Sequence, residues 1–187
     1  MAETALAKTP VRRIDTLPDC FRQGMRRLAA GVCVLTSDLD GMPVGLTATA
    51  VTSLSAEPPR LLACVNRKVS AYTAFEKARA LCVNVLSASD VDIARRFAGM
   101  VPDVSGPDRF ATSMWKGKVP ALSGALASFQ CHIAEMVQAG THSILICDVE
   151  SVVVGEVDTA PLVYAHGQFS ALVDDSSVKE KEGNECR

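Results

Sequence analysis

Apolar residues occur mostly in short runs rich in β-branched side chains, and turn residues separate these runs. Runs of this kind are typical of strands. Strands are expected over 32–36, 42–51, 61–66, 80–86, 125–137, 143–154 and 162–169. Many strands at close spacing with only a few helices predict a mainly β fold, a β-barrel or closed sheet, rather than a doubly wound α/β fold.

Apolar residues recur at helical spacing in three further places. The first helix is expected to begin at Asp19, which is placed to cap it, and to end by Gly31. The second is expected over 70–77, with two aromatic side chains toward the core. The third is expected over 89–97, with either of its first two residues as the cap.

Three connecting segments carry turn or loop signals. The segment 37–41 is expected to be a hairpin loop, because it ends in the turn dipeptide Asp40-Gly41. Residues 138–142 are expected to form a second turn. The stretch 99–119 holds several glycines and prolines, and a long irregular loop of this kind is often a functional lid or a partner contact.

The length of 187 residues favours one domain with a full core. The domain is expected over 17–173. Residues 1–16 lack a clear hydrophobic period and are expected to form a flexible arm. The polar segment 174–187 is expected to be a disordered tail. There is no internal repeat and no sign of a second domain.

Composition and charge narrow the class of protein. The formal charge of −2 argues against broad nucleic-acid binding, which needs a strongly basic face. The seven cysteines lack CxxC spacing, and five lie inside apolar runs, which is the pattern of a reduced cytoplasmic protein rather than a disulfide scaffold. No apolar run approaches the roughly 20 residues that span a bilayer. We therefore expect a soluble, cytoplasmic protein with no membrane or nucleic-acid partner.

Several familiar catalytic signatures are missing from the sequence. There is no GxGxxG after a strand, no GxxxxGK[ST] and no GxSxG, so Rossmann, P-loop and nucleophile-elbow sites are not supported. Cys131 and His132 are adjacent within a strand and would point to opposite faces, which makes them a poor metal site. No metal is expected.

The segment 45–70 is the most informative stretch of the chain. It opens with small and hydroxylated residues and ends in Arg67-Lys68 and Ser70. Small side chains let a ligand approach the backbone, hydroxyls donate hydrogen bonds, and cationic groups neutralise a phosphate. A flat, phosphate-bearing ligand would suit this surface. Two strands joined by a proline-containing loop would give the same composition.

The three histidines differ in their sequence context. His132 lies inside an apolar strand and is expected to be structural. His142 sits at a turn before a strand, where a side chain can project into a cleft, although a turn histidine is more often simply exposed. His166 lies in the segment 164–169, where a glycine between two aromatics could admit a planar ligand or serve plain strand packing.

Five blocks in order resemble the flavin reductase family, the small NAD(P)H:flavin oxidoreductase components of two-component flavin-dependent monooxygenases. The blocks are FRQGMRRLAAGVCVLT, GLTATAVTSLSAEPPRLLACVNRKVS, LCVNVLSASDVDIARRFAG, AGTHSILICDVESV and PLVYAHGQFSAL. They span nearly the whole of the expected domain. The resemblance implies an FMN-binding split β-barrel that assembles as a homodimer, with the flavin near the subunit interface.

The resemblance also implies a set of site residues. The flavin ring and ribityl chain are expected to contact Thr47, Ala48, Thr49, Ala50, Ser53 and Leu54. The isoalloxazine is expected to border Cys64, Val65 and Asn66, and the phosphate Lys68 and Ser70. The family's RFA block, also beside the flavin, is matched by Arg96, Phe97 and Ala98. The nicotinamide is expected to face His142, and a terminal block associated with the same cofactor is matched by Tyr164, His166, Gly167 and Phe169.

Two departures from the family pattern bear on the site. The family often has Asn-Ser-Phe where this chain has Thr49-Ala50-Val51, so flavin contact here is expected to depend more on backbone groups. The acidic residue that precedes the family histidine is Thr141 in this chain. Because no carboxylate neighbours His142 in sequence, an orienting role is expected for it rather than that of an obligatory acid.

The resemblance implies an NAD(P)H-dependent flavin reductase that reduces FMN or FAD and supplies the reduced flavin to a separate monooxygenase, in a setting such as aromatic hydroxylation. The sequence leaves FMN or FAD, and NADH or NADPH, open. Two alternatives remain at this stage. One is a reductase that retains its flavin and reduces another acceptor, such as a corrinoid or a ferric chelate. The other is a non-catalytic split-barrel protein that binds flavin or haem.

Overall fold

The computed structural model describes residues 16–155 and 159–172. Apart from Thr16, the expected arm over 1–16 lies outside the described residues, as does the expected tail over 174–187. The fold is mostly β, with 49% strand and 20% helix, which confirms the predicted fold class. Within the described ranges, no helix is long and apolar enough to cross a membrane.

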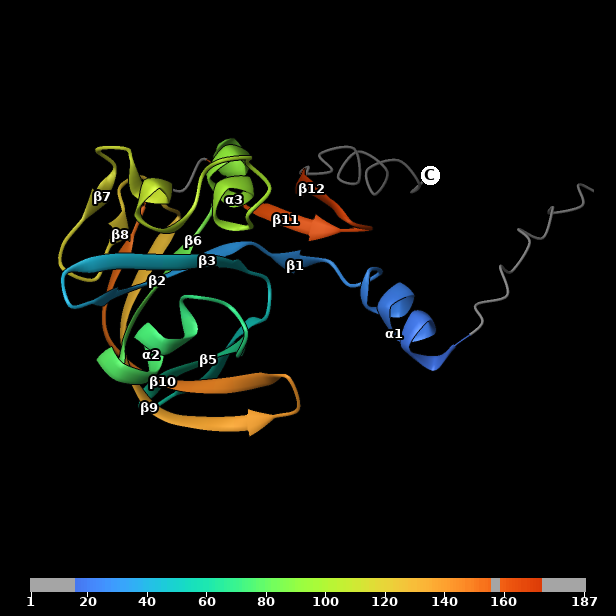
Figure 1. Cartoon of the computed structure of the whole chain (residues 1–187), viewed down its shortest axis with the longest axis horizontal. Coiled ribbons are helices and arrows are strands. Elements are labelled where there is room, and N and C mark those ends of the chain that lie inside the picture. Colours follow the sequence, from blue (N-terminus) through green and yellow to red (C-terminus); the bar gives the residue numbers. More distant parts are fainter. Residues whose placement is uncertain (1–15, 156–158, 173–187) are drawn as a thin grey trace, which may run out of the picture.

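Seven antiparallel strands form the main sheet, in the order β3-β2-β6-β9-β10-β5-β4 (Figure 1). Their bounds are β2 Cys33–Leu39, β3 Met42–Ala48, β4 Val51–Ala56, β5 Pro59–Asn66, β6 Ala80–Val85, β9 Ala127–Ala139 and β10 His142–Val154. The two edge strands, β3 and β4, are not paired with each other, so the sheet is open. The expectation of a closed sheet is corrected in this respect.

The predicted turn at Asp40-Gly41 is confirmed. Both residues have positive φ angles, 54° and 85°, and they join β2 to β3 as a two-residue hairpin turn. The hairpin loop is shorter than the expected 37–41, because residues 37–39 still belong to β2. The expected strand over 42–51 is two strands, and residues 49–50 carry the chain from one edge of the sheet to the other.

A three-stranded sheet lies beside the main one, in the order β1-β11-β12. Its strands are β1 Ala30–Gly31, β11 Leu162–Ala165 and β12 Gln168–Ala171. The expected single strand over 162–169 is therefore a hairpin. His166 and Gly167 form its turn with φ angles of 54° and 80°. A further short strand, β7 Trp115–Lys116, lies within the segment 99–119 that the sequence indicated to be irregular, and it pairs with β8 Ala121–Leu122 just beyond that segment.

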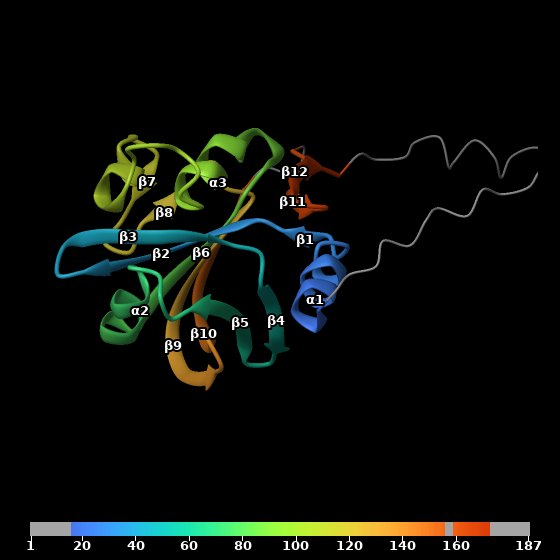
Figure 2. The same cartoon turned by 45° about the vertical axis from the view of Figure 1, so that its right-hand side comes forward.

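Helix α1 spans Leu17–Met25, and its cap differs from the expected one. Thr16 is the N-cap residue, and its hydroxyl accepts a hydrogen bond from the backbone N–H of Asp19 at 3.3 Å. The helix has no buried residue. It stands at the side of the molecule in both views (Figure 2). Its apolar side chains, with that of Leu28 just beyond its end, are between 48% and 81% exposed.

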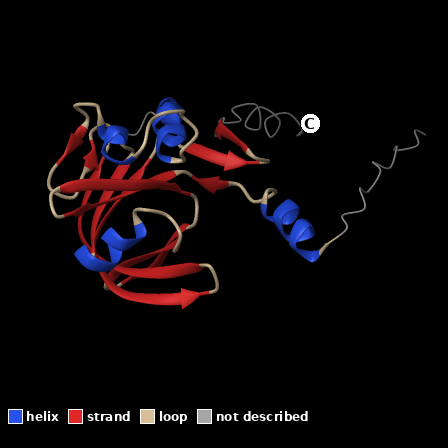
Figure 3. Ribbon diagram, viewed as in Figure 1, coloured by secondary structure: helices blue, strands red, loops and turns tan. Residues whose placement is uncertain are grey.

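Two other helices cover the strands. Helix α2, Tyr72–Ala78, buries Phe75 completely, as expected. Helix α3, Val91–Phe97, has Asp90 as its N-cap residue, one of the two that were expected, although the Asp90 side chain makes no cap hydrogen bond to α3. It follows the short 3₁₀ helix η1, Ala88–Asp90, whose capping box is formed by Ser87 and Asp90. Figure 3 shows α2 and α3 on opposite sides of the central strands.

The buried apolar residues form two clusters. The first packs the main sheet against α2 and centres on Leu35, Phe75 and Leu81. The second packs α3, the small sheet and the 99–122 segment together, and it includes Phe97, Leu122 and Leu162. The two clusters divide the molecule into a sheet half and an α3 half, and the predicted site residues are distributed over both.

Candidate functional site

The close contact between β3 and α3 depends on a glycine, Gly45. A Cβ atom at Gly45 would lie 2.8 Å from the ring of Phe97 and 2.9 Å from the carbonyl oxygen of Leu35. Only a glycine therefore lets the Phe97 ring lie directly on β3. One turn earlier in the helix, the hydroxyl of Thr47 donates to the carbonyl oxygen of Ala94 at 2.7 Å. These contacts bring the predicted residues of α3 beside the predicted residues of β3.

The crossing from β3 to β4 forms an exposed shelf, which we define as residues 49–54. Thr49, Ala50, Ser53 and Leu54 are all exposed. The hydroxyls of Thr49 and Ser53 have no hydrogen-bond partner among the described residues, so both can bind a ligand. The carbonyl of Ala50 accepts from the backbone N–H of Cys64 at 2.9 Å, which ties the shelf to β5.

Not every predicted flavin contact presents its side chain to this surface. Ala48 is 8% exposed and Val65 is 1% exposed, and both belong to the first core cluster. The Phe97 ring is 2% exposed within the second cluster. These positions can contribute only their backbone groups to a ligand at this surface.

The end of β5 lies beside the start of β10. Asn66 pairs with His142, and Cys64 pairs with Ile144 two residues further along. The exposed ring of His142 has a neutral partner, because its Nδ1 lies 2.9 Å from the hydroxyl oxygen of Thr141. The structure therefore brings His142 together with the predicted residues of β5, as the sequence indicated.

Arg67 has a role that the sequence did not indicate. Its guanidinium donates to the carbonyl oxygen of Gly140 at 2.7 Å and to the side-chain oxygen of Gln138 at 3.1 Å. Its backbone N–H donates to the carbonyl oxygen of Thr141 at 3.0 Å. Arg67 thus braces the β9–β10 hairpin that carries His142. The neighbouring side chains of Lys68 and Ser70 are exposed and are available to an anion.

The terminal block lies in the other half of the molecule. The rings of Tyr164 and Phe169 are in edge contact at 5.2 Å, and both pack against the second cluster. His166 is exposed at the hairpin turn, and its backbone N–H donates to the carbonyl oxygen of Arg26 at 2.7 Å. The β9–β10 hairpin lies at the bottom of both Figure 1 and Figure 2, while β11 and β12 lie near the top. One chain therefore does not bring His142 together with the terminal block.

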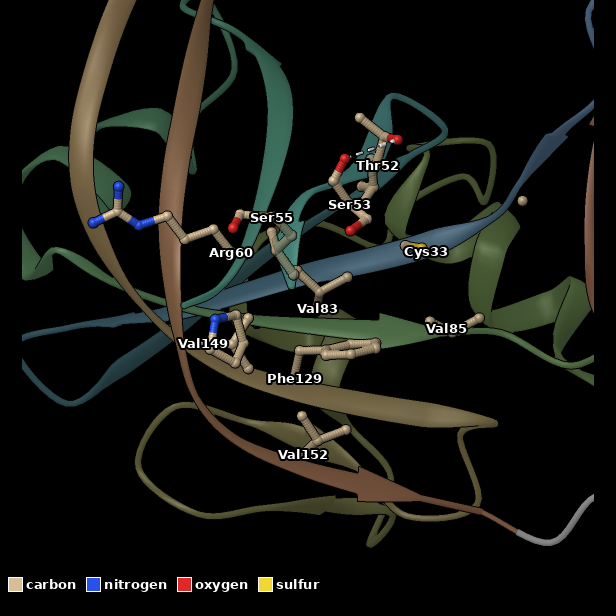
Figure 4. A pocket seen from close by; sticks show the side chains of 14 residues that line it. Cys33, Thr52, Ser53, Ser55, Arg60, Val83, Val85, Phe129, Val149 and Val152 are labelled. Carbon is tan, nitrogen blue, oxygen red and sulfur yellow. Dashed lines mark hydrogen bonds between the residues drawn. The ribbon is translucent and has the colours of Figure 1, made fainter. Parts of the chain in front are cut away.

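An apolar cavity of about 350 Å³ adjoins the first core cluster and is lined in part by Val51, Thr52 and Ser53 of the shelf (Figure 4). Its walls include Val83, Val85, Phe129 and Val149, and its rim holds Ser53. Ser53 is the only predicted site residue that lines it. The shelf thus borders this cavity, and the other predicted site residues lie outside its lining.

The buried cysteines are unsuited to chemistry at neutral pH. Burial raises the pKa of the Cys33 thiol from its ordinary 9.0 to about 12. Burial likewise raises the pKa of Cys82, Cys131 and Cys147 to about 12, although hydrogen bonding with Thr36 and Asn84 partly opposes the shift at Cys82. No group of metal-binding side chains is found in the described part of the chain.

Comparison with known proteins identifies the family. The chain folds as a mainly β domain, and its residues 25–172 match the family model described as "Flavin reductase like domain". The chain therefore belongs to the flavin reductase family, which confirms the resemblance seen in the sequence.

Two curated relatives illustrate the match. The chain is 42% identical over 156 residues to FMN reductase (NADH) RutF 2 of Methylorubrum extorquens strain PA1, covering 81% of this chain and 88% of that protein. It is 40% identical over 163 residues to the 4-hydroxyphenylacetate 3-monooxygenase reductase component of Pseudomonas aeruginosa, covering 86% of this chain and 95% of that protein.

A solved structure with bound cofactors is also similar. The Streptomyces globisporus NADH:FAD oxidoreductase SgcE6, in complex with NAD and FAD fragments, superimposes with a TM-score of 0.75 and 27% identity. The match covers 83% of this chain and 93% of that one.

Proposed function

We propose that the chain is an NADH-dependent flavin reductase that reduces FMN or FAD and supplies the reduced flavin to a separate monooxygenase. The family match over residues 25–172 carries this proposal. It is supported by relatives that are NADH-dependent FMN reductases, by one that is the reductase component of 4-hydroxyphenylacetate 3-monooxygenase, and by a neighbour that holds NAD and FAD fragments. We also propose 17–173 as the extent of the domain.

The residues present fit a flavin. The shelf over 49–54 offers small side chains, accessible backbone at the point where β3 and β4 part, and two hydroxyls to which no described residue is hydrogen-bonded. When bound, a flavin supplies the hydride-accepting ring and NADH supplies the hydride. The chain's own task is to hold the two rings in register and exclude water, which is catalysis by proximity.

We propose the predicted residues as the site, with His142 as an orienting group for the nicotinamide. Its ring is exposed, and its hydrogen bond with Thr141 involves a neutral hydroxyl. That bond fixes the ring's direction without placing a carboxylate beside it. The remaining proposed contacts are Thr47, Ala48, Thr49, Ala50, Ser53, Leu54, Cys64, Val65, Asn66, Lys68, Ser70, Arg96, Phe97, Ala98, Tyr164, His166, Gly167 and Phe169.

Steady-state oxidation of NADH, followed by its absorbance with FMN, FAD or riboflavin as acceptor, tests the activity. We expect turnover that saturates with added flavin. His142→Ala should raise the KM for NADH about tenfold, the effect of one lost hydrogen bond of about 1.4 kcal/mol, while leaving flavin affinity unchanged. His132→Ala is the matched control, because His132 is also exposed on the β9–β10 pair. No NADH oxidation with any flavin would overturn the reductase assignment, and unchanged kinetics in His142→Ala would remove His142 from the site.

We propose that two copies of the chain form the working unit, with the flavin near their interface. Two features support this. His142 and the terminal block lie in different halves of one chain, so a complete site needs a second copy. Helix α1 also leaves an apolar face uncovered, including Phe21 at 64% exposure, and an exposed apolar face of this kind marks an interaction surface.

Light scattering after gel filtration tests the assembly. The wild-type protein should have twice the 19.8 kDa mass of the chain. Phe21→Glu should yield single chains, because it places a charge in the apolar contact. Gln23→Glu, on the same helix, should leave the dimer intact. A wild-type protein that elutes as a single chain would contradict the proposal.

We propose the cytoplasm as the compartment. The thiols of Cys33, Cys64, Cys82, Cys131 and Cys147 are free in the structure, which is the state that reducing compartments maintain. Cell fractionation tests this, and recovery with the periplasmic or secreted fraction would contradict it.

A further inference from the structure

Arg109 lies in the α3 half of the molecule, within a segment that the sequence marked only as irregular. It belongs to the 3₁₀ helix η2, Gly106–Phe110. The ring of the next residue, Phe110, meets Phe97 at 4.9 Å and Trp115 at 5.0 Å between centroids. Three aromatic rings thus hold η2 against the end of α3, and they fix the backbone from which the Arg109 side chain extends.

The guanidinium of Arg109 is half-buried and poorly satisfied. Its Nη1 donates to the carbonyl oxygen of Gly45 in β3, at a long 3.3 Å. Its Nε is buried and has no hydrogen-bond partner in the described part of the chain. A guanidinium carries five N–H donors, and leaving a buried donor without a hydrogen bond costs free energy.

No carboxylate within residues 16–155 and 159–172 forms an ion pair with Arg109. Among the described residues the ion pairs are Asp19–Arg22, Arg60–Asp148 and Asp92–Arg95, and none includes Arg109. A charged group held away from water in this way normally has a counter-ion.

A second guanidinium lies on the same side. Arg96, near the end of α3, is half-buried and reaches only the carbonyl oxygen of Asp108, at 3.4 Å. It too has no carboxylate partner among the residues described. Between the two arginines, Gly99 has a φ angle of +71°, and a Cβ there would lie 3.7 Å from Nη2 of Arg109. Arg96 therefore contacts the residue before Arg109, and Gly99 lies beside Arg109, which places both arginines where the end of α3 meets η2.

We propose that Arg109, together with Arg96, forms a binding site for a nucleotide phosphate. Planar guanidinium groups bind phosphate through two parallel hydrogen bonds, and a pair of them matches a doubly charged group. The site adjoins the predicted flavin contacts, because Gly45 precedes Thr47 on β3 and Arg96 precedes Phe97 on α3. The proposal rests on the proposed function, in which both FMN and NADH carry phosphate.

Equilibrium titrations followed by flavin or dihydronicotinamide fluorescence test the site and identify the phosphate. FMN is compared with riboflavin, and NADH with reduced nicotinamide riboside, because the second member of each pair lacks phosphate. Arg109→Gln should weaken either FMN or NADH about 10- to 100-fold, as expected for a lost charge-assisted hydrogen bond. The affinity for the phosphate-free member of that pair should change by no more than about twofold. Weaker FMN binding would show that the site binds the flavin phosphate, and weaker NADH binding would show that it binds the dinucleotide phosphate.

Two further variants sharpen the result. Arg109→Lys keeps the charge without the planar fork, so its affinity should lie between those of the wild type and Arg109→Gln. Arg95→Gln is the matched control, since Arg95 is exposed on α3 and lies 3.8 Å from Asp92. Its affinities should equal those of the wild type. The proposal is overturned if Arg109→Gln weakens both members of a pair alike, or weakens none of the ligands.

The wild-type protein gives an independent answer if Arg109→Gln does not fold. Inorganic pyrophosphate should displace FMN or NADH and should not displace riboflavin or reduced nicotinamide riboside. Displacement of neither phosphate-bearing ligand would overturn the site. The proposed function fails separately: protein that binds FMN and NADH through Arg109 but never oxidises NADH would retain the phosphate site and lose the reductase assignment.

Discussion

Asn84 and Arg109 both concern the 99–122 segment, Asn84 through its bond to Leu122 and Arg109 as a member of the segment, and they satisfy their polar groups in opposite ways. Asn84 is fully buried, and its Nδ2 donates to the carbonyl oxygen of Val34 at 3.1 Å. Its Oδ1 accepts from the backbone N–H of Leu122 at 2.7 Å and from the hydroxyl of Ser128 at 3.0 Å. Arg109, in contrast, keeps a buried donor with no partner among the residues described.

The difference separates structural polar groups from functional ones. A buried polar group that its own chain satisfies rigidifies the fold. A cationic group that the chain leaves unsatisfied is free to bind an anion. On this view Asn84 anchors the end of the 99–122 segment to the sheet, and Arg109, within the segment, serves a ligand.

Asn84→Ala should have the largest effect on stability. It leaves the N–H of Leu122 and the hydroxyl of Ser128 without their buried acceptor, so the free energy of unfolding should fall by about 3 kcal/mol. Urea denaturation measures it. Gln130→Ala is the control, because Gln130 makes one 3.2 Å bond to the carbonyl oxygen of Val119 and should cost about 1 kcal/mol. A loss below 1 kcal/mol in Asn84→Ala would mean that this network does not anchor the segment.

Gly45→Val should come next, with effects on both stability and binding. Its side chain would collide with the Phe97 ring and with the β2 backbone, which should cost about 2 kcal/mol and displace α3. FMN affinity should fall as well, because α3 carries Arg96. Gly24→Ala is the control: nothing lies within 4 Å of Gly24 in α1, and alanine should stabilise that helix by about 0.5 kcal/mol. Unchanged FMN affinity in a folded Gly45→Val protein would separate α3 from the site.

The sequence predicted the parts of the fold that local patterns encode. The Asp40-Gly41 turn was clear because both residues favour positive φ angles. The turn at His166-Gly167 was missed, because a histidine at positive φ is uncommon and the flanking apolar residues continue the pattern. The break at residues 49–50 was missed for a similar reason, since threonine and alanine carry no turn signal.

The candidate site was predicted through the family resemblance rather than through local chemistry. The blocks located the shelf and the β5 residues that pair with His142. In the structure, the shelf is bonded to β5, and β5 pairs with the start of β10. Arg109 lies in an irregular segment, and its contact with Gly45 joins residues far apart in the sequence. In the sequence, Arg67 was interpreted as a cation that can neutralise a phosphate. Its bonds to Gln138 and Gly140 could not be predicted locally, because they form only when the β9–β10 hairpin folds against β5.

A smaller effect is expected at Cys64, the half-buried thiol on the sheet side of the proposed site. With FMN at ten times its Kd, alkylation of Cys64 should slow about tenfold, because only the free protein reacts. Mass spectrometry of iodoacetamide-treated protein measures the rate. Cys33 is the internal control, since its buried thiol should stay unlabelled with or without FMN. Labelling of Cys64 at the same rate in both conditions would place the flavin elsewhere.

The smallest effect is expected from the buried thiols. Their ionisation should change the free energy of unfolding only at alkaline pH and leave it unchanged at neutral pH. The pKa of each of the four buried thiols rises from 9.0 to about 12 on folding. The unfolded chain therefore loses these protons first as the pH rises. Their contribution to stability is complete below pH 9 and is lost as the pH approaches 12. Thermal melts across this range check it, and Cys33→Ala should reduce the alkaline decline. A loss of stability that begins below pH 8 would show that a group other than these thiols causes it.

Anaerobic bleaching of excess flavin tests the central claim most directly. The protein is mixed with NADH and a large molar excess of FMN, and the loss of the oxidised flavin absorbance is compared with the amount of protein. A reductase that releases its product should bleach many equivalents of flavin per chain. Bleaching that stops at one equivalent would show that the flavin is retained, and it would contradict the transfer of reduced flavin to a separate monooxygenase.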